Sequence, residues 1–570
     1  MNRRKFLTDI SITVLPEEEQ QKSLSPIDNP FANKVLPKVE RTNSGLEPHT
    51  GVWGFDQVAH LLKRTMFGAT KNDITAMMSQ TLDDVVTMLL AAQPTPPPPI
   101  NVSTSDTGVP LGQTWVTAPR LNSDGTNPNN QRNQSLKAWW IGLMLDQPVS
   151  LTEKMTLFWH NHFVTETVET SDARFSYKYL ALLRQYALGN FKDMVREITI
   201  DPAMLKYLNG NTNTKTNPNE NYARELQELF TIGKGPEIAP GNYTNYTEDD
   251  VIAAARVLTG WRTDATNISS YFTLSRHDTA NKQFSADYGN TVITGSSDPT
   301  GMAEINALLD MIFIQNETAK YICRKLYRYF VYYVIDDAAE ANVITPLANI
   351  FRSNNYDVKP VLQTLLKSAH FFDSVNMGCM IKNPMELNVG TCRLFSVQFP
   401  TAVDYVTQYD HWKYLRTQAS GMQLDLCDPP NVAGWPAYYQ LPQFYELWVN
   451  SDTLPKRNKF TDTLVTPGYK KGGFTLIIDS IAFVNQVSDP SDPNVIINEF
   501  AQLLFPIVIT DNQKAFLKGV LIPGLPDYEW TVEWNDYLAD PTNQTKLNSV
   551  KSKLQALLAF MMDMAEYQLT

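Results

Sequence analysis

The chain has 570 residues, enough for one large body or for two to four domains of ordinary size. A composition that is 43% hydrophobic and 19% charged excludes an intrinsically disordered protein. The formal net charge of −12 and the lack of a basic stripe in the sequence disfavour a nucleic-acid-binding groove, so no nucleic-acid partner is expected.

The amino terminus combines a basic start with a weak apolar segment. The stretch RRKFL at residues 3–7 resembles a twin-arginine export signal, but Asp9 interrupts the apolar residues and no A-x-A cleavage site follows. Two interpretations stay open: a degenerate or uncleaved export signal, and a chance basic start. Residues 1–48 have little periodicity and many polar residues and prolines, which predicts an extended arm over the body. No apolar run reaches about 18 residues, so no transmembrane helix is expected.

Helical patterns begin after this arm. FDQVAHLLKRT opens a helix at Phe55, and Gly68 is expected to end it as the C′ residue. Residues 69–92 predict one further helix. The segment 93–110, QPTPPPPINVSTSDTGVP, is rich in proline and predicts a nonhelical stretch that wraps around or links the helices.

Helix start and stop signals are dense between residues 133 and 261. Asp-Pro at 201–202 predicts an N-cap followed by an N1 proline. Asn-Pro-Asn-Glu at 217–220 predicts a capping box for a helix that Gly233 ends, and Thr-Glu-Asp-Asp at 247–250 predicts a second capping box.

Strand signals are confined to residues 271–295, where YFTL and NTVI predict at most a small hairpin. Helical patterns resume at 303–371 and 384–395 and continue to the carboxyl terminus. The expected fold class is therefore mostly α: a large multi-helix single body with long proline-rich loops. We expect residues 49–450 to form its core and residues 451–570 a helical carboxyl-terminal part of the same body.

The cysteines do not have metal-binding or redox spacing. Cys323, Cys379, Cys392 and Cys427 form no CxxC pair, so structural thiols are the preferred interpretation. A disulfide between Cys379 and Cys392 stays open, because four cysteines in so long a chain neither require nor exclude an oxidising compartment.

Seven motifs occur in a fixed order along the chain. They are HLLKRTMFG (60–68), FWHNHFVT (158–165), LLRQYALGNFKDMVREITIDPAMLKYLNG (182–210), NPNENYARELQELFTIG (217–233), YTEDDVIAAARVLTGW (246–261), RHDTANKQF (276–284) and PPNVAGWP (429–436). With them the chain resembles, over about residues 45–570, the domain of unknown function 1800 family (DUF1800), in the form common among Bacteroidota. In PPNVAGWP we expect turn geometry and aromatic packing, with Asn431 and Trp435 lining a groove as the alternative.

The resemblance implies a predominantly α-helical fold without an established activity. It also implies export, and therefore a place in the periplasm or cell envelope. Members of the family are often encoded beside a second family that looks like secreted sulfatases or phosphatases, which makes such a protein the expected partner.

Two of the seven histidines, His160 and His162, lie in FWHNHFVTE. In a helix His162 shares a face with Met155 and Phe158, while His160 lies about 200° away. The two histidines can bind one metal ion only if the helix ends or bends near Asn161. The alternative is a pair of buried histidines that are hydrogen-bonded to backbone or carboxylate groups.

The best candidate for a functional acid is Glu225, in PNENYARELQELF. Helical spacing places it at the border of an apolar arc, where an unpaired carboxylate is costly. The alternative to a functional role is an ion pair with an arginine such as Arg64, Arg184 or Arg256.

A loop histidine beside a carboxylate, His277 with Asp278, completes the candidate set. Together His160, His162, Glu225 and His277 would suit zinc, manganese or iron by ligand type. Glu225 or Asp278 would then move the proton. The motifs HExxH, GxSxG, GxGxxG and GxxxxGK[ST] are absent from the sequence.

Two functions follow from these residues. The first is a metal-dependent hydrolase of the cell envelope, whose divalent ion lowers the pKa of bound water. The second is a non-catalytic scaffold or assembly partner of a secreted complex, in which the same groups form a buried polar network. Composition is compatible with both.

Overall fold

The computed structural model describes residues 42, 44–240 and 242–570. The chain divides into two units, Met1–Thr42 and Asn43–Thr570, and all helices and strands described below belong to the second unit. The RRKFL stretch and most of the predicted arm lie outside the described residues.

Three helices open the second unit: α2 (Phe55–Thr65), α3 (Lys71–Met78) and α4 (Leu82–Leu89). Helix α2 begins where the sequence predicts, but it ends at Thr65 with Met66 as its C-cap, so the prediction of Gly68 as the C′ residue is wrong by one position. The single helix expected over residues 69–92 is wrong. Thr70 and Thr81 each form a capping box with the Asp three residues later, so the chain begins a helix twice in this stretch.

A long irregular segment separates these helices from the next group. The described residues 93–110 contain no helix, as the prolines require. The segment leads into α5 (Asn129–Asp146), α6 (Thr152–His162), α7 (Thr167–Thr170), α8 (Ala173–Gln185) and α9 (Phe191–Thr199). Helix α5 packs against α8 and, far along the chain, against α19 (Tyr405–Gly421).

Two of the predicted helix starts are confirmed. The Asp201 side chain accepts a hydrogen bond from the Ala203 N–H and caps α10 (Pro202–Tyr207). Thr247 forms the expected capping box at the start of α12 (Glu248–Val257).

The capping box predicted at residues 217–220 is wrong. Helix α11 (Asn221–Glu225) begins only after Glu220, and Asn219 Oδ1 accepts a hydrogen bond from the first N–H of α11. The helix continues as the π-helical turn η2 (Leu226–Thr231) and stops before Gly233, whose φ of +77° is the left-handed conformation of a helix end.

The strands are short and pair antiparallel: β1 (Glu237–Ala239) with β2 (Asn242–Tyr243), β3 (Trp261–Asp264) with β4 (Ser269–Phe272), β5 (Lys282–Gln283) with β6 (Val292–Ile293), and β7 (Tyr469–Lys471) with β8 (Phe474–Leu476). Both segments predicted as strands contribute residues, but YFTL does not pair with NTVI. Each instead pairs with a strand that precedes it closely in sequence, because a short loop closes a hairpin most easily.

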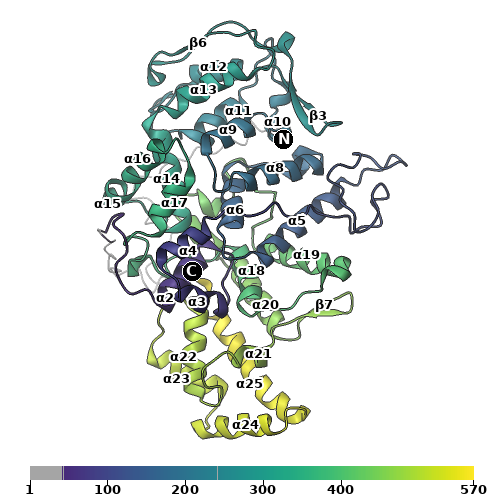
Figure 1. Ribbon diagram of the computed structural model, residues 1–570, viewed down its shortest axis with the longest axis vertical. Helices are drawn as coiled ribbons and strands as arrows, with labels where there is room; N and C mark the ends of the chain where they lie inside the picture. Colours follow the sequence, from purple (N-terminus) through teal and green to yellow (C-terminus); the bar gives the residue numbers. More distant parts are fainter. Residues whose placement is uncertain (1–41, 43, 241) are drawn as a thin grey trace, which may run out of the picture. The chain divides into compact units, whose positions relative to one another are not determined.

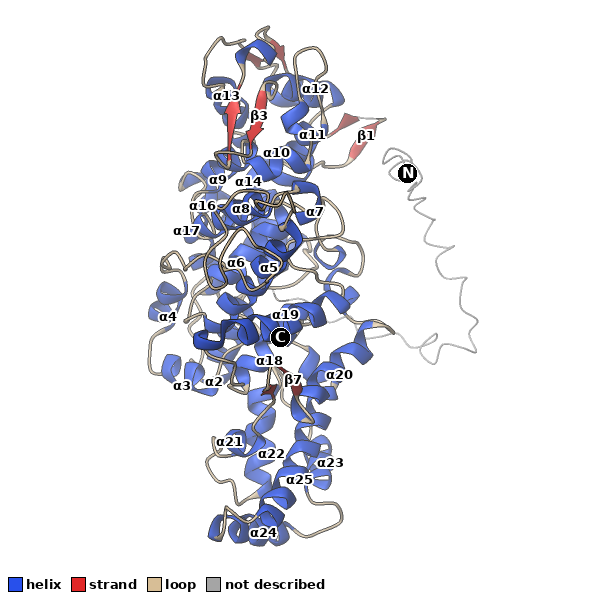
Figure 2. Cartoon of the chain, turned by 90° about the vertical axis from the view of Figure 1, so that its right-hand side faces the viewer, coloured by secondary structure: helices blue, strands red, loops and turns tan. Residues whose placement is uncertain are grey.

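The remaining α-helices of the unit are α13 (Met302–Phe313), α14 (Asn316–Phe330), α15 (Asp337–Ala339), α16 (Thr345–Ser353), α17 (Val358–Leu366), α18 (Pro384–Leu394), α20 (Thr453–Val465), α21 (Ser480–Val484), α22 (Pro493–Leu504), α23 (Asp511–Leu521), α24 (Asp527–Ala539) and α25 (Gln544–Asp563). Helices α21 to α25 gather at one end of the unit (Figure 1). With 55% of residues in helices and only small strand pairs (Figure 2), the predicted mostly-α fold class is confirmed.

The hydrophobic core has two parts, and α6 contributes to both. Phe158 packs in the part built mainly by α2 to α17, and Leu157 packs in the part built mainly by α5, α18, α19 and the carboxyl-terminal helices. Gly68 joins these regions, because a Cβ there would come within 2.6 Å of Gly390 Cα in α18. The histidine-bearing helix therefore lies at the boundary between two packed regions.

The four cysteines are free, so the disulfide left open between Cys379 and Cys392 is not formed. Cys392 is buried, whereas Cys379 is partly exposed. Among the helices of residues 42–570 that the structure describes, none is long and apolar enough to span a lipid bilayer.

Candidate functional site

His162 is the last residue of α6, and its imidazole joins two other helical segments. His162 Nε2 donates to the backbone oxygen of Phe230 in η2, at 2.9 Å. Because a carbonyl only accepts, the ring proton is on Nε2, and Nδ1 is free to accept a hydrogen bond from Lys325 Nζ at 3.2 Å. Burial, and then the charge of Lys325, hold the pKa of His162 well below its usual value.

His160 has entirely different neighbours. Its ring lies between Trp140 and Trp435, with centroid distances of 5.7 and 6.0 Å, and burial lowers its pKa to about 4. The buried Nδ1 has no hydrogen-bond partner among the described residues. His160 and His162 thus serve different neighbours, as their helical spacing predicts.

Glu225 lies at the junction of α11 and η2 without an ion-pair partner among the residues that the structure describes. The three arginines considered as partners are engaged elsewhere: Arg64 with the Asn376 backbone, Arg184 with Glu153 and Arg256 with Asp278. Burial, and then the neighbouring Glu228 carboxylate, raise the pKa of Glu225 to about 8.

His277 belongs to a buried network of its own. Its Nε2 lies 3.0 Å from Glu304 Oε1, and Glu304 also pairs with the buried Lys282. Asp278, the second candidate acid, accepts a hydrogen bond from Arg256 Nε at 2.7 Å. These contacts match the buried polar network that the sequence left open as the alternative.

The convergence of His160, His162, Glu225 and His277 expected from the sequence is not observed. Throughout the described residues, no three His, Cys, Asp or Glu side chains are grouped closely enough to hold a metal ion. The physical reason is that each histidine is held by a different part of the core. The assignment of these residues as metal ligands stays a prediction, because the described side chains do not form a set of ligands around one point.

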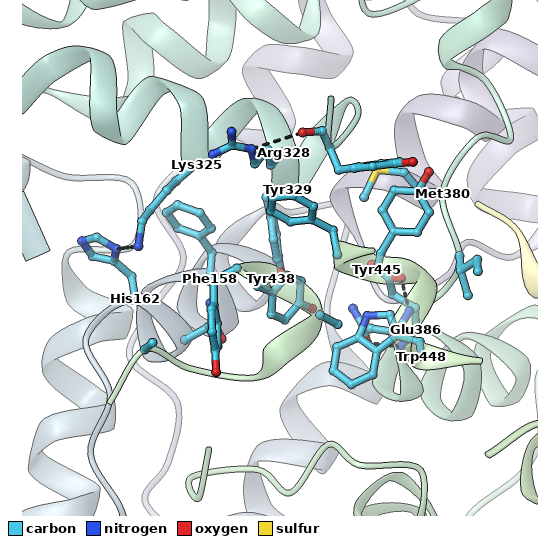
Figure 3. A pocket seen from close by; sticks show the side chains of 18 residues that line it. Phe158, His162, Lys325, Arg328, Tyr329, Met380, Glu386, Tyr438, Tyr445 and Trp448 are labelled. Carbon is cyan, nitrogen blue, oxygen red and sulfur yellow. Dashed lines mark hydrogen bonds between the residues drawn. The ribbon is translucent and has the colours of Figure 1, made fainter. Parts of the chain in front are cut away.

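A narrow cavity of about 40 Å³ lies beside His162. It is bounded by α6, α14, the start of α18 and residues 433–448, which include the short helices η8 (Pro436–Tyr438) and η9 (Phe444–Trp448). Much of its wall is aromatic, including Phe158, Tyr329, Tyr333, Tyr438, Tyr445 and Trp448 (Figure 3). Its volume is that of a few water molecules, so the cavity itself can enclose only a small group.

Two cations from α14 line this cavity one helical turn apart. Lys325 Nζ donates to His162 and lies 4.9 Å from the centre of the Tyr321 ring, while Arg328 Nε donates to the Tyr333 backbone oxygen at 3.2 Å. Neither cation has a carboxylate partner within the described part of the chain. Burial, and then Arg328, lower the pKa of Lys325 to about 7.

The carboxylate that lines the same cavity, Glu386, is already paired. It forms an ion pair with the buried Lys154, and its other oxygen accepts from the Asn383 N–H in the capping box of α18. Glu386 therefore pairs with neither Lys325 nor Arg328.

Two of the sequence motifs meet at the cavity wall. Asn161, between the two histidines, accepts a hydrogen bond through Oδ1 from the Trp435 N–H of PPNVAGWP at 2.9 Å. Asn161 also lines the cavity, whereas the buried Trp435 packs behind it. Sequence reasoning missed Lys325 and Arg328, although their i, i+3 spacing within the aromatic-rich stretch YICRKLYRYFVYYV was a signal.

Comparison with protein families gives one match. The family described as "Protein of unknown function (DUF1800)" matches residues 60–569. The chain belongs to this family. The DUF1800 match includes every residue that lines the cavity, from Phe158 to Trp448, and the four residues predicted as ligands. Comparison with curated proteins and with solved structures finds no match.

Proposed function

We propose that the cavity beside His162 binds the anionic group of a small molecule, and that a flat apolar part of that molecule packs against the aromatic side chains of the cavity wall. The supporting observation is the pair Lys325 and Arg328, two cations on one cavity wall that have no carboxylate partner among the described residues. A bound anion would provide the missing counter-charge. Charge-assisted hydrogen bonds to a carboxylate, phosphate or sulfate are the strong kind, and Arg is suited to bidentate contact.

The rest of the wall favours a flat apolar body. Tyrosine and tryptophan rings supply large contact areas and stack on planar groups. The rings of Tyr445 and Phe444 both pack against the ring of Tyr333, with centroid distances of 4.9 and 5.6 Å, respectively. These rings form a preorganised surface, which lowers the entropic cost of binding.

Titration calorimetry with benzoate, phenyl phosphate and the neutral benzyl alcohol tests the proposal. We expect at least one of the anions to bind, with benzyl alcohol weaker by about tenfold or more, because one charge-assisted hydrogen bond contributes about 1.5–3 kcal/mol. Arg328→Met is expected to weaken anion binding by a similar factor.

Lys320→Met is the matched control. Lys320 lies on the same helix and its removal changes the net charge equally, but its partner is Glu340 at 3.9 Å and it does not line the cavity. Equal affinity for benzyl alcohol and the anions, or equal losses in Arg328→Met and Lys320→Met, would rule out a specific anion site.

The functions expected from the sequence remain as separate proposals. For a metal-dependent hydrolase with zinc, manganese or iron at His160, His162, Glu225 and His277, the described residues provide no ligand cluster. Elemental analysis of the purified protein, intact and with the histidines replaced, tests this function directly. The non-catalytic scaffold has the satisfied network around His277 and Glu304 in its favour.

We also propose export to the periplasm or cell envelope, and a secreted sulfatase-like or phosphatase-like protein as partner. The support is the RRKFL stretch and the family resemblance. Fractionation of native cells tests the location, and a purely cytosolic pool would exclude export. Co-purification from the envelope fraction tests the partner.

A further inference from the structure

We propose that a second cavity, between α2 and α22, binds a fatty acid of medium chain length, with its carboxylate on Lys63 and its alkyl chain against the apolar wall. This site is separate from the cavity beside His162 and goes beyond the function proposed for that cavity. The proposal stands on the size of the second cavity, the composition of its wall and the position of one cation.

The second cavity is large enough to enclose a ligand. Its volume is about 510 Å³, against about 40 Å³ beside His162. This volume lies within the range of small-molecule sites, roughly 300–1,000 Å³. One face of α2, the second half of α22 and residues 505–509 form most of the wall, and Ser374, Met377, Lys514 and Thr570 complete it.

Much of the wall is aliphatic. Its apolar side chains are Ala59, Met377, Ala501, Phe505, Pro506, Ile507, Val508 and Ile509. Phe505 supplies the only benzene ring among the lining side chains that the structure describes, so the wall suits an alkyl chain better than a stack of flat rings. Ile507 and Val508 are 40% and 88% exposed, and an alkyl chain would remove part of this apolar surface from water.

Close contacts hold the wall in place. A Cβ at Gly378 would lie 2.5 Å from Ile507 Cγ2, so the loop after α22 packs directly on the backbone at Gly378. Lys71 Nζ lies 2.9 Å from Glu499 Oε2 and thereby joins α3 to α22. A wall that is already ordered loses little conformational entropy when a ligand binds.

Lys63 places an ammonium group in this wall. Its Nζ donates to the Leu503 backbone oxygen at 2.9 Å, in the last turn of α22. An ammonium group has three hydrogens, so two remain for a ligand. A carbonyl does not neutralise the charge, and no carboxylate among the described residues forms an ion pair with Lys63. Burial lowers the pKa of Lys63 to about 8 against the opposing effect of Asp56, so desolvation outweighs the negative charge nearby.

The other titratable groups of the wall leave this cation available. Asp56 is exposed to solvent, and Glu499 is paired with Lys71. His60 is neutral, because burial holds its pKa well below its usual value. Lys514 adds a second cation that has no carboxylate partner among the described residues. A bound carboxylate would provide the counter-charge that the wall lacks, through a charge-assisted hydrogen bond.

Titration calorimetry of the full chain with three eight-carbon probes tests the role of the charge. The probes are octanoate, 1-octanol and octylammonium, which share the alkyl chain and differ in the head group. We expect octanoate to bind, 1-octanol to bind about tenfold or more weakly, and octylammonium to bind weakest of the three. Octanoate binding no tighter than that of 1-octanol would overturn the role of Lys63.

A chain-length series tests the apolar wall. From hexanoate through octanoate to decanoate, all below their micelle concentrations, each added CH₂ should tighten binding about fourfold, the factor that corresponds to about 0.8 kcal/mol per buried CH₂. The same affinity for all three acids would overturn an enclosed alkyl chain, even if a carboxylate binds.

Variants place the ligand in this cavity. Lys63→Met should weaken octanoate binding about tenfold or more and leave 1-octanol binding nearly unchanged, whereas Lys63→Arg should keep the preference for octanoate. Lys456→Met is the control, because Lys456 is exposed and does not line the cavity. Equal losses in Lys63→Met and Lys456→Met would overturn the site.

Ala501→Leu gives a second test that does not depend on Lys63. The larger side chain would occupy part of the cavity, so decanoate should lose more affinity than hexanoate. Circular dichroism checks that each variant is folded. Should Lys63→Met fail to fold, the wild-type probe series and Ala501→Leu still decide the inference.

Arg328→Met separates this site from the cavity beside His162. We expect octanoate binding to be unchanged in Arg328→Met and benzoate binding to be unchanged in Lys63→Met. If Arg328→Met weakens octanoate binding as much as Lys63→Met does, the fatty acid does not bind between α2 and α22 alone and the inference is wrong. If octanoate binding depends on Lys63 only, the inference holds whether or not benzoate binds beside His162.

Discussion

Asn161 and Trp435, 274 residues apart, are joined by a hydrogen bond of 2.9 Å from the Trp435 N–H to Asn161 Oδ1. Gly434, the residue directly before Trp435, has a φ of +101°. A Cβ at Gly434 would lie 2.3 Å from Asn161 Oδ1 and 2.7 Å from Asn161 O. PPNVAGWP therefore approaches the end of α6 so closely that only glycine fits.

Gly434→Ala should be strongly destabilising, by roughly 2–4 kcal/mol, because backbone strain adds to a steric clash. Urea unfolding gives the measurement. Gly421→Ala, in α19, is the control: a Cβ there would meet no atom within 4 Å and its φ is not positive, so the change should be neutral or slightly stabilising. Similar losses in both variants would contradict the close approach.

Glu304→Gln should destabilise the protein by roughly 3–5 kcal/mol, because it leaves the buried charge of Lys282 without its counter-ion. The side chains of Lys282 and Glu304 are 0% and 3% exposed. The same change at an exposed pair, Asp452→Asn beside Lys456, should cost less than about 1 kcal/mol. Thermal and urea unfolding of the two variants give the comparison, and a small effect at Glu304 would argue against the buried network.

Glu225→Gln should become more stabilising as the pH rises. The carboxyl pKa is about 8 in the folded protein and about 4.3 in an unfolded chain, so between these values the folded state holds the extra proton and wild-type stability falls with pH. The variant lacks this pH-dependent loss of stability. Its free energy of unfolding relative to wild type should therefore increase by about 1–3 kcal/mol between pH 4.5 and 8, a range that allows for the partial exposure of Glu225. Urea unfolding at several pH values checks this, with Glu220→Gln as the exposed control; a pH-independent difference would contradict the raised pKa.

Lys325→Met should show the opposite dependence. The folded pKa of about 7 is below the unfolded value of about 10.4, so wild-type stability rises with pH across this window. The stability of the variant relative to wild type should therefore be highest below pH 7 and decline by about 1–2 kcal/mol towards pH 10. The readout is the slope of this stability difference against pH, since loss of the hydrogen bond between Lys325 and His162 adds an offset that does not depend on pH. A flat difference, equal to that of Lys320→Met, would mean that the amine has an ordinary pKa.

Local signals predicted most of the helix starts. Asp201 and Thr247 cap helices as expected, because capping depends on residues within one turn. The break at Thr81 had the same kind of signal, with Asp84 three residues later, and was missed because the apolar pattern continues across it. Glu220 does not complete the predicted capping box, because the helix starts later than a proline at its first position would place it. The side chain of Asn219, rather than that of Asn217, accepts a hydrogen bond from the first N–H of the helix.

The candidate site was predictable only in part. Helical spacing correctly separated His160 from His162, but the partner of His162 Nε2 is a backbone carbonyl in a π-helical turn, which no side-chain pattern encodes. The cavity that Lys325 lines also includes residues more than a hundred positions later, such as Tyr445 and Trp448. Burial of this kind depends on tertiary packing, so a sequence window around Lys325 cannot reveal its lowered pKa.

The long separation between the cavity walls has a consequence for synthesis. On the ribosome α6 and α14 exist well before residues 433–448, so a nascent chain has both cations before it has the later part of the aromatic wall, Tyr438, Tyr445 and Trp448. Contacts this distant in sequence are slow to form. The binding site is thus a late product of translation, and a chain terminated before Trp448 would carry the charged half of the site open to water.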